Sequence, residues 1–220
     1  MITLQQLTKR YRKKEVYDAI SLEIPAGGMT LFIGQNGIGK STLLKMIAGI
    51  EQPDAGVILY DGAQWTASER KKHIGYVPQE MALWEHMTID ENIKFFKGLL
   101  KDTIGDERIT YYLEKLAIAH ERQTIVKKLS GGTQRKVNLL IGLLAKPTIL
   151  ILDEPTVGID LKSRTEIQQV LRELSATCTV LLTTHLVDEI EAFTDNIVLI
   201  GDDAFYRQLL EDKHIAYTKL

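Results

Sequence analysis

The chain has 220 residues, 45% hydrophobic and 25% charged, a composition typical of one folded domain or of two small ones that share a core. It is too apolar to be disordered and too poor in glycine and proline, with 16 and 5 respectively, to be fibrous. Its 27 basic and 29 acidic residues leave a formal net charge of −2, so no overall positive charge holds a polyanion. We expect no nucleic-acid partner.

Several features predict a cytoplasmic chain. Cys178 is the single cysteine and cannot form an internal disulfide, and residues 1–15 are polar and basic where a signal peptide needs an apolar core. The longest mostly apolar stretch, residues 137–145, is about half the roughly 20 residues that span a bilayer. We therefore expect the protein to reach a membrane only through a partner.

Short apolar segments alternate with longer segments of helical periodicity along much of the chain. Their continuous apolarity predicts strands buried on both faces, as in a parallel sheet. The predicted strands cover residues 30–33, 57–60, 74–77, 148–152, 179–183 and 197–200. This alternation predicts an α/β fold with a mainly parallel sheet flanked by helices.

Residues 81–145 break the alternation, because residues 90–100 and 109–116 predict helices with no convincing strand between them. A further apolar stripe with helical spacing follows at residues 137–144. We expect this segment to be a helical subdomain inserted into the sheet domain. A basic run at residues 9–14, which contains Lys13 and surrounds Tyr11, is interpreted as a solvated loop.

A phosphate-binding pattern follows the first predicted strand. Residues 34–41 read GQNGIGKS, which matches G-x-x-x-x-G-K-[ST] and directly precedes a predicted helix. The glycines let backbone N–H groups point at phosphate oxygens, and Lys40 would neutralise the β- and γ-phosphates. Ser41 would offer its hydroxyl to Mg²⁺. The predicted cradle consists of Gly34, Gln35, Asn36, Gly37, Ile38, Gly39, Lys40, Ser41 and Thr42.

Two carboxylates, Asp153 and Glu154, follow the predicted strand 148–152, at the strand edge where open α/β sheets bind ligands. Asp153 would hold Mg²⁺ through water, and Glu154 would polarise or deprotonate the water that attacks the γ-phosphate. In isolation an Asp-Glu pair can be a solvated strand end, but the phosphate cradle favours catalysis.

Further strings stand in a fixed order around these two motifs: YVPQE with Gln79, LSGGT at residues 129–133, VGID ending at Asp160, and TTH ending at His185. With the cradle and ILILDEP, they resemble the nucleotide-binding cassettes of ATP-binding cassette (ABC) transporters over nearly the whole chain. Other P-loop enzymes, such as kinases and small GTPases, do not carry LSGG. The resemblance implies a single ABC ATPase domain over 1–220, with a P-loop NTPase core (1–80 and 146–220), an antiparallel β subdomain near the N-terminus, and the helical subdomain 81–145 carrying LSGG.

In this family the LSGG of one cassette closes over the ATP held by the cradle of another. The resemblance therefore implies a second cassette, identical or not, as partner in the ATP-bound state. Ser130, Gly131 and Gly132 would bind that nucleotide, and their place at a helix start suits an anion. The usual Gln at the fifth position is replaced by Thr133, which puts only a secondary contact in doubt.

The resemblance assigns the remaining roles. Tyr11 would stack on adenine, and Asp160 would cross the dimer interface and help to set the opposite site. Gln79 would contact Mg²⁺ and the attacking water, and His185 would contact the γ-phosphate. The implied catalytic residues are Glu154, His185 and Gln79, and the implied Mg²⁺ ligands are Ser41, Gln79 and Asp153.

The resemblance implies an ATPase that uses ATP and Mg²⁺ to energise export of a small molecule, peptide or lipid. The transport path would belong to separate transmembrane permease subunits, with this chain peripheral on the inner face of the cell membrane. The alternative is a soluble non-transport ABC ATPase in cofactor assembly or regulation. A P-loop kinase or GTPase is a more distant alternative.

Overall fold

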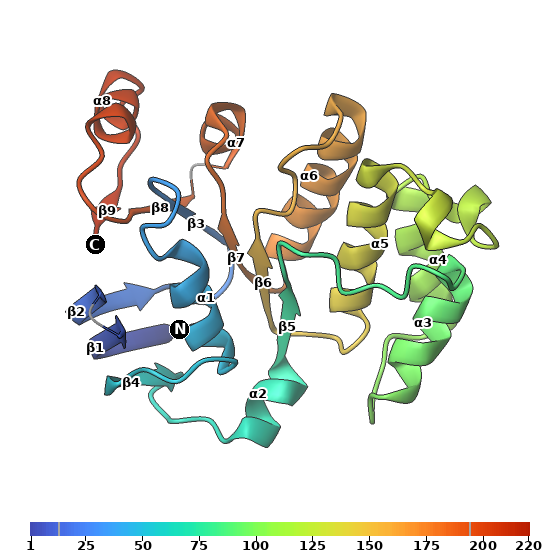
Figure 1. Cartoon of the computed structure of the whole chain (residues 1–220), viewed down its shortest axis with the longest axis horizontal. Helices are drawn as coiled ribbons and strands as arrows, with labels where there is room; N and C mark the ends of the chain where they lie inside the picture. Colours follow the sequence, from blue (N-terminus) through green and yellow to red (C-terminus); the bar gives the residue numbers. More distant parts are fainter. Residues whose placement is uncertain (13, 194) are drawn as a thin grey trace.

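The computed structural model describes residues 1–12, 14–193 and 195–220, which fold into two sheets with helices around them (Figure 1). The smaller sheet is antiparallel, in the order β2-β1-β4. Its strands are β1 (Ile2–Tyr11), β2 (Lys14–Ile24) and β4 (Ala55–Tyr60). A register shift between Leu4 and Leu7 keeps Leu7 on the buried face with Ile2 and Leu4, because one extra residue restores the side-chain alternation.

The larger sheet is parallel and runs in the order β5-β6-β7-β3-β8-β9 among the described residues. Its strands are β3 (Met29–Ile33), β5 (Ile74–Val77), β6 (Ile149–Asp153), β7 (Thr179–Thr183), β8 (Asn196–Leu199) and β9 (Thr218–Lys219). Every residue of β3, β6 and β7 is buried, as their continuous apolar sequence predicts. The carboxyl ends of these strands therefore meet at one edge.

Helix α1 (Lys40–Ala48) lies between the two sheets. Its residues Leu43, Leu44, Met46 and Ile47 pack in one cluster with apolar side chains of both sheets. The helix ends at Gly49, which adopts a left-handed conformation with φ of 70°. Helix α2 (Ala67–His73) begins with a capping box formed by Thr66 and Glu69.

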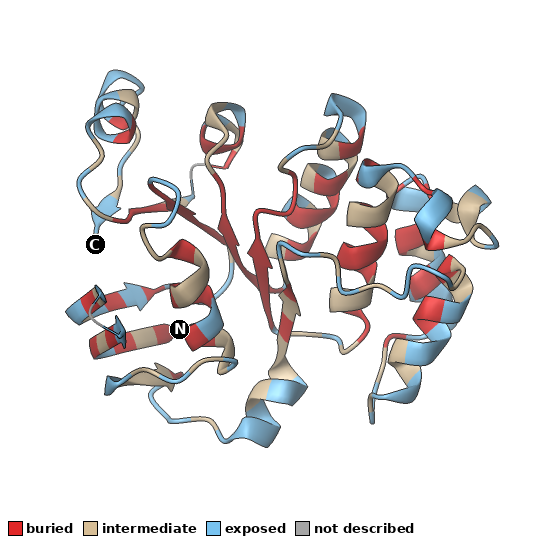
Figure 2. Cartoon of the chain, viewed as in Figure 1, coloured by how far each residue is buried: buried red, intermediate tan, exposed pale blue. Residues whose placement is uncertain are grey.

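A second apolar cluster joins the other face of the parallel sheet to the remaining helices. These are α3 (Ile89–Gly98), α4 (Asp106–Lys115), α5 (Gly131–Leu143), α6 (Leu161–Ser175), α7 (Val187–Ala192) and α8 (Ala204–Asp212), with short 3-10 turns at Ala119–Glu121 and Val126–Lys128. Buried residues concentrate in the central strands and on the inner sides of α5 and α6 (Figure 2). No helix among the described residues has the length and apolarity that crossing a bilayer requires.

The α/β fold, its mainly parallel sheet and its antiparallel β subdomain are confirmed, but some assignments were wrong. The segment 57–60, predicted to be buried on both faces of a parallel sheet, is only partly buried at residues 57–59 and pairs with β1 in the antiparallel sheet. The basic run was expected in a loop. Instead Lys9 and Arg10 lie at the end of β1, where they pair with Glu51 and Glu15, while Lys13 lies outside the described residues.

The close contact between β5 and α5 requires glycine at position 75. A Cβ built on Gly75 would lie 2.5 Å from the carbonyl oxygen of Gly142 and 3.0 Å from Pro147 Cγ. We expect Gly75→Ala to lower the free energy of unfolding by about 1–3 kcal/mol, because backbone must move to admit the methyl group. Urea denaturation measures the change.

The matched control is Gly98→Ala, because a Cβ on Gly98 at the end of α3 meets no described atom within 4 Å. This control is expected to be neutral or to stabilise by up to about 1 kcal/mol. Equal stabilities of the two variants would contradict the close packing of β5 on α5.

Candidate active site

The predicted phosphate cradle connects β3 to α1, and its glycines occupy positions that other residues cannot. Gly34 and Gly39 have φ of 149° and 120°. A Cβ on Gly34 would lie 2.6 Å from the carbonyl oxygen of Ile200, and one on Gly39 would lie 2.6 Å from Val16 Cγ1. The loop can therefore curl against β8 and β2 only with glycine at these two positions.

Lys40 begins α1 and is 5% exposed. Its Nζ donates hydrogen bonds to the carbonyl oxygens of Gly34 (2.8 Å) and Gln35 (3.0 Å). Burial lowers the pKa of Lys40, while the nearby carboxylates of Glu154 and Asp153 act in the opposite direction. A buried ammonium group held by two neutral carbonyls suits an incoming phosphate, which would supply full charge neutralisation.

The hydroxyl of Thr183 connects the carboxyl ends of β6 and β7. This hydroxyl donates to Asp153 Oδ1 at 2.7 Å and accepts from the backbone N–H of Glu154 at 2.9 Å. Thr183 and Asp153 are also direct register partners in the sheet. Glu154 itself has φ of 49°, an uncommon conformation that turns the chain sharply after the strand. Thr183 therefore holds both predicted carboxylates in place.

The carboxylate of Glu154 lies between the other two predicted catalytic side chains. Gln79 Nε2 donates to Glu154 Oε2 at 2.9 Å, and His185 Nδ1 lies 3.3 Å from Glu154 Oε1. Gln79 follows β5 and His185 follows β7, so three separate segments deliver the group. A carboxylate fixed by two polar neighbours can accept a proton from a nearby water.

Cradle and carboxylate line the same cavity of about 310 Å³, a volume within the range of small-molecule sites. Its lining residues are Asn36, Gly37, Gly39, Lys40, Ser41, Thr42, Gln79 and Glu154. Ser41, Gln79 and Asp153 provide the hard oxygen donors that Mg²⁺ prefers. The described residues contain no cluster of three or more His, Cys, Asp or Glu side chains suited to a metal. The Mg²⁺ site stays a prediction.

Tyr11 lies at the end of β1, close to Thr42, and is 44% exposed. Its hydroxyl donates to Glu51, and Lys9 Nζ lies 5.2 Å from the centroid of its ring. Burial, together with the hydrogen bond to Glu51, raises the pKa of Tyr11, against a smaller lowering by Thr42. The stacking of this ring on adenine stays a prediction.

The signature residues form a second group with Asp160. Ser130 caps α5 through its hydroxyl, which accepts from the N–H of Thr133 at 3.1 Å. Asp160 caps α6 in the same way, and its bond from the N–H of Ser163 lowers the pKa of Asp160. A Cβ on Gly132 would lie 2.7 Å from Asp160 Oδ2, so only glycine allows α5 and α6 to begin this close together.

The two groups are separate within the chain. Neither Asp160 nor a signature residue is among the residues that line the cavity. Helices α1 and α5, which carry the cradle and the signature at their starts, lie on opposite sides of β5 and β6 (Figure 1). A nucleotide in the cavity therefore leaves the signature of the same chain free for another contact.

The residues that hold the Gln79 segment against α5 were not predicted from the sequence. Arg135 donates to the carbonyl oxygen of Gln79, and burial lowers the pKa of this half-buried arginine. Asn138 accepts from the N–H of Ala82 at 3.3 Å and donates to the carbonyl oxygen of Pro78 at 3.4 Å. The available signal was Asn138 itself, a polar residue within an apolar run that must find a partner when buried.

Comparisons with known proteins identify the family of the chain. A family model described as "ABC transporter" matches residues 17–157. The chain is 36% identical to the linearmycin resistance ATP-binding protein LnrL of Bacillus subtilis (strain 168), and the match covers 91% of this chain and 66% of the relative. It is 33% identical to the sulfate/thiosulfate import ATP-binding protein CysA of Neisseria meningitidis serogroup A, covering 91% of this chain and 58% of the relative.

The chain thus spans about two thirds or less of the length of these two relatives. Among solved structures, it is similar to a dimeric ATP-binding cassette in a post-hydrolysis state bound to ADP and Pi. That similarity has a TM-score of 0.76 at 26% identity and covers 90% of this chain and 94% of the other.

Thr183→Val is expected to lower the free energy of unfolding by about 1–3 kcal/mol, because it leaves the buried N–H of Glu154 and Asp153 Oδ1 without their shared partner. Thr183→Ser keeps the hydroxyl and is expected to lose less. Thermal and urea denaturation of both variants measure the difference. A valine variant as stable as the serine variant would contradict the role given to this hydroxyl.

Proposed function

Because this chain belongs to the ABC transporter family, we propose that it binds and hydrolyses ATP to energise transport through separate transmembrane subunits. One observation carries the proposal: the Glu154 carboxylate, held between Gln79 and His185, shares a cavity with the buried ammonium group of Lys40. Such a cavity offers a phosphate site, with a proton acceptor where the γ-phosphate would lie.

We divide the chain accordingly into one ABC ATPase domain, 1–220. Residues 1–80 and 146–220 form its P-loop ATPase core, and residues 81–145 form a helical subdomain that carries the signature. This division follows the helices α3, α4 and α5, which pack together away from the antiparallel sheet.

In the proposed mechanism the N–H groups of residues 34–42 surround the phosphates, and Lys40 neutralises the β- and γ-phosphate oxygens. Ser41, Gln79 and Asp153 would hold Mg²⁺, which when bound supplies positive charge to those same oxygens. Glu154 accepts the proton of the attacking water as the new O–P bond forms and the bond between the γ-phosphorus and the ADP oxygen breaks. His185 steadies the charge that develops on the γ-phosphate.

A second cassette would complete each site with its Ser130, Gly131 and Gly132. The separation of cavity and signature within one chain supports this proposal, since the signature can then contact only a nucleotide held by another chain. The similar solved cassette with ADP and Pi is also dimeric. The second cassette can be an identical chain or a different one. A homodimer with twofold symmetry would have two equivalent ATP sites.

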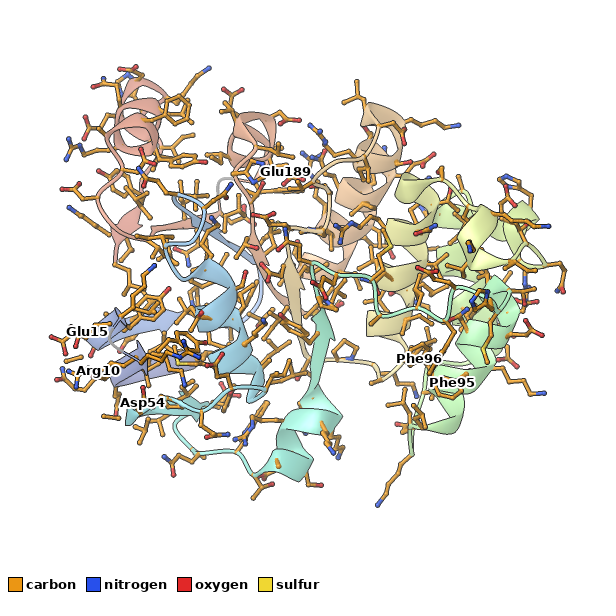
Figure 3. All side chains as sticks on the ribbon, viewed as in Figure 1. Arg10, Glu15, Asp54, Phe95, Phe96 and Glu189 are labelled. Atoms are coloured by element: carbon orange, nitrogen blue, oxygen red, sulfur yellow. The ribbon has the colours of Figure 1, made fainter. Side chains whose placement is uncertain are left out.

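The transmembrane partner is proposed to dock on the helical subdomain. Trp84, Phe95 and Leu99 are 53%, 36% and 67% exposed. Phe95 and Leu99 line a groove together with Met87, Glu91, Lys94 and Gly98. Figure 3 labels Phe95 on α3, where its ring meets Trp84 edge-on with centroids 5.5 Å apart. The exposed apolar side chains begin at Trp84, five residues after Gln79 in the chain. Helix α3 packs on α5, whose Arg135 donates to the carbonyl oxygen of Gln79, so a loop seated here would be connected to the nucleotide site through α5.

We place the chain on the cytoplasmic, inner face of the cell membrane, and we propose export as the direction. The strings LSGGTQRK and EPTVGID support the export branch, with a small molecule, peptide or lipid as substrate. One similar relative is named for linearmycin resistance and another for sulfate/thiosulfate import, so the names of the relatives leave direction open. A soluble ATPase for cofactor assembly or regulation is the alternative.

Glu154→Gln tests the hydrolytic step. We expect kcat to fall by a factor of about 10² to 10⁴, because the amide cannot accept the proton, while ATP affinity is preserved. The variant should also accumulate as an ATP-bound dimer. Phosphate release measures kcat, and light scattering measures the dimer. Unchanged turnover would contradict the assignment of Glu154.

Lys40→Ala tests the phosphate site. The Kd for ATP, measured by calorimetry, should rise by a factor of about 10 to 100, since one charge-assisted contact with phosphate is lost. Lys45→Ala, in the last turn of the same helix, is the matched control and should bind normally. If Lys40→Ala binds within a few-fold of the wild type, the nucleotide lies elsewhere.

Isolation from native membranes in mild detergent separates the transporter from its alternative. Recovery of the chain with a polytopic membrane protein is the expected result, and Trp84→Asp should reduce it. Recovery with soluble partners only would favour cofactor assembly or regulation.

A further inference from the structure

A buried carboxylate behind the site has no part in the mechanism described above. Glu189, in α7, is 1% exposed and lies on the side of α7 that faces α6 (Figure 3). Its Oε1 accepts hydrogen bonds from the Thr156 hydroxyl at 2.5 Å and from Gln168 Nε2 at 3.3 Å. Its Oε2 is buried without a hydrogen-bond partner among the described residues. Burying a carboxylate away from water costs free energy, and the hydrogen bonds from these two donors offset part of that cost.

The Thr156 bond connects the two segments that carry catalytic side chains. Thr156 is fully buried and stands two residues after Glu154, while Glu189 stands four residues after His185. The bond therefore joins the turn after β6 to the helix after β7. A second contact between the same segments is the 3.3 Å approach of His185 Nδ1 to Glu154 Oε1. The two contacts link residues 154–156 and 185–189 into a closed ring, and Glu154 and His185 are part of this ring.

The turn after β6 needs such support. Glu154 has φ of 49°, which a side chain with a Cβ adopts only when surrounding structure enforces it. On the β7 side, the hydroxyl of Thr184 accepts from the N–H of Leu186 at 3.1 Å and so shapes the backbone around His185. The Thr156–Glu189 bond ties these two shaped segments to each other.

We propose that Glu189 is a positioning residue for ATP hydrolysis, which acts through Thr156 to set the distance between Glu154 and His185. The inference rests on the proposed function. Neither residue is among those that line the cavity, so the effect on substrate is indirect. Because a displacement of about 1 Å at reacting groups can cost a factor of 10² in rate, losing this tie should lower turnover before it lowers affinity.

A different contact between α6 and α7 provides a matched control. Arg164 on α6 pairs with Asp188 on α7, directly beside Glu189, but this pair does not reach Thr156. Asp188→Asn thus weakens the packing of the two helices and leaves the ring intact. A purely structural role for Glu189 would be shared by Asp188, whereas a positioning role would not.

The experiment measures kcat, the KM and Kd for ATP, and the thermal midpoint of the purified chain. Thr156→Val should lower kcat by a factor of at least about 10, with KM and Kd within about twofold of wild type. Thr156→Ser should restore most of the rate, and Asp188→Asn should leave it within about twofold. Glu189→Leu, which removes the acceptor at similar side-chain size, should behave like Thr156→Val and replaces it if that variant does not fold.

A double variant decides whether the tie acts through the catalytic pair. In a His185→Ala background, Thr156→Val should cost less than about twofold, because the residue it positions is gone. An undiminished effect there, an unchanged kcat in both Thr156→Val and Glu189→Leu, or a failed rescue by serine would overturn the inference. A wild-type chain that binds ATP without hydrolysing it would instead contradict the proposed function.

Discussion

The hydroxyl of Thr183 is the contact from which the active site is built. It fixes Asp153 and the backbone of Glu154 at the end of β6, and the parallel pairing of β6 with β7 fixes Thr183 in turn. From this position the Glu154 side chain reaches both Gln79 and His185. A shift of β7 by one residue would point the Thr183 side chain to the opposite face of the sheet, because side chains alternate along a strand. The hydroxyl would then lose its hydrogen bonds with Asp153 and Glu154.

Helix α5 unites functions that are distant in the sequence. Its start carries the signature cap of Ser130, and its middle carries Arg135 and Asn138, which hold the segment of Gln79. Lys136 on the same helix pairs with Glu166 of α6 in a largely buried contact. A movement of α5 would therefore change the signature and the Gln79 segment together. In the proposed function, this coupling would connect the nucleotide site to the apolar surface around Trp84.

Local chemistry made much of the fold predictable. The cradle needs its glycines, and strands such as β3, β6 and β7 are apolar at every position, so both could be predicted from the sequence. Strands β1 and β2 were missed because they alternate with exposed polar residues and a register shift interrupts the period. The Thr156–Glu189 bond could not be predicted, since it joins residues 33 positions apart through tertiary packing alone.

The central claim is that each ATP site combines the cradle of one chain with the signature of another. Mixing two inactive variants, Lys40→Ala and Gly131→Glu, tests it most directly. A Cβ on Gly131 meets no described atom within 4 Å, so the glutamate should fold normally yet repel the γ-phosphate. In each mixed dimer one of the two sites regains both intact halves. Because random pairing of equal amounts makes half of the dimers mixed, the mixture should recover about a quarter of the wild-type ATPase rate. No recovery in a mixture shown to contain mixed dimers would contradict the claim.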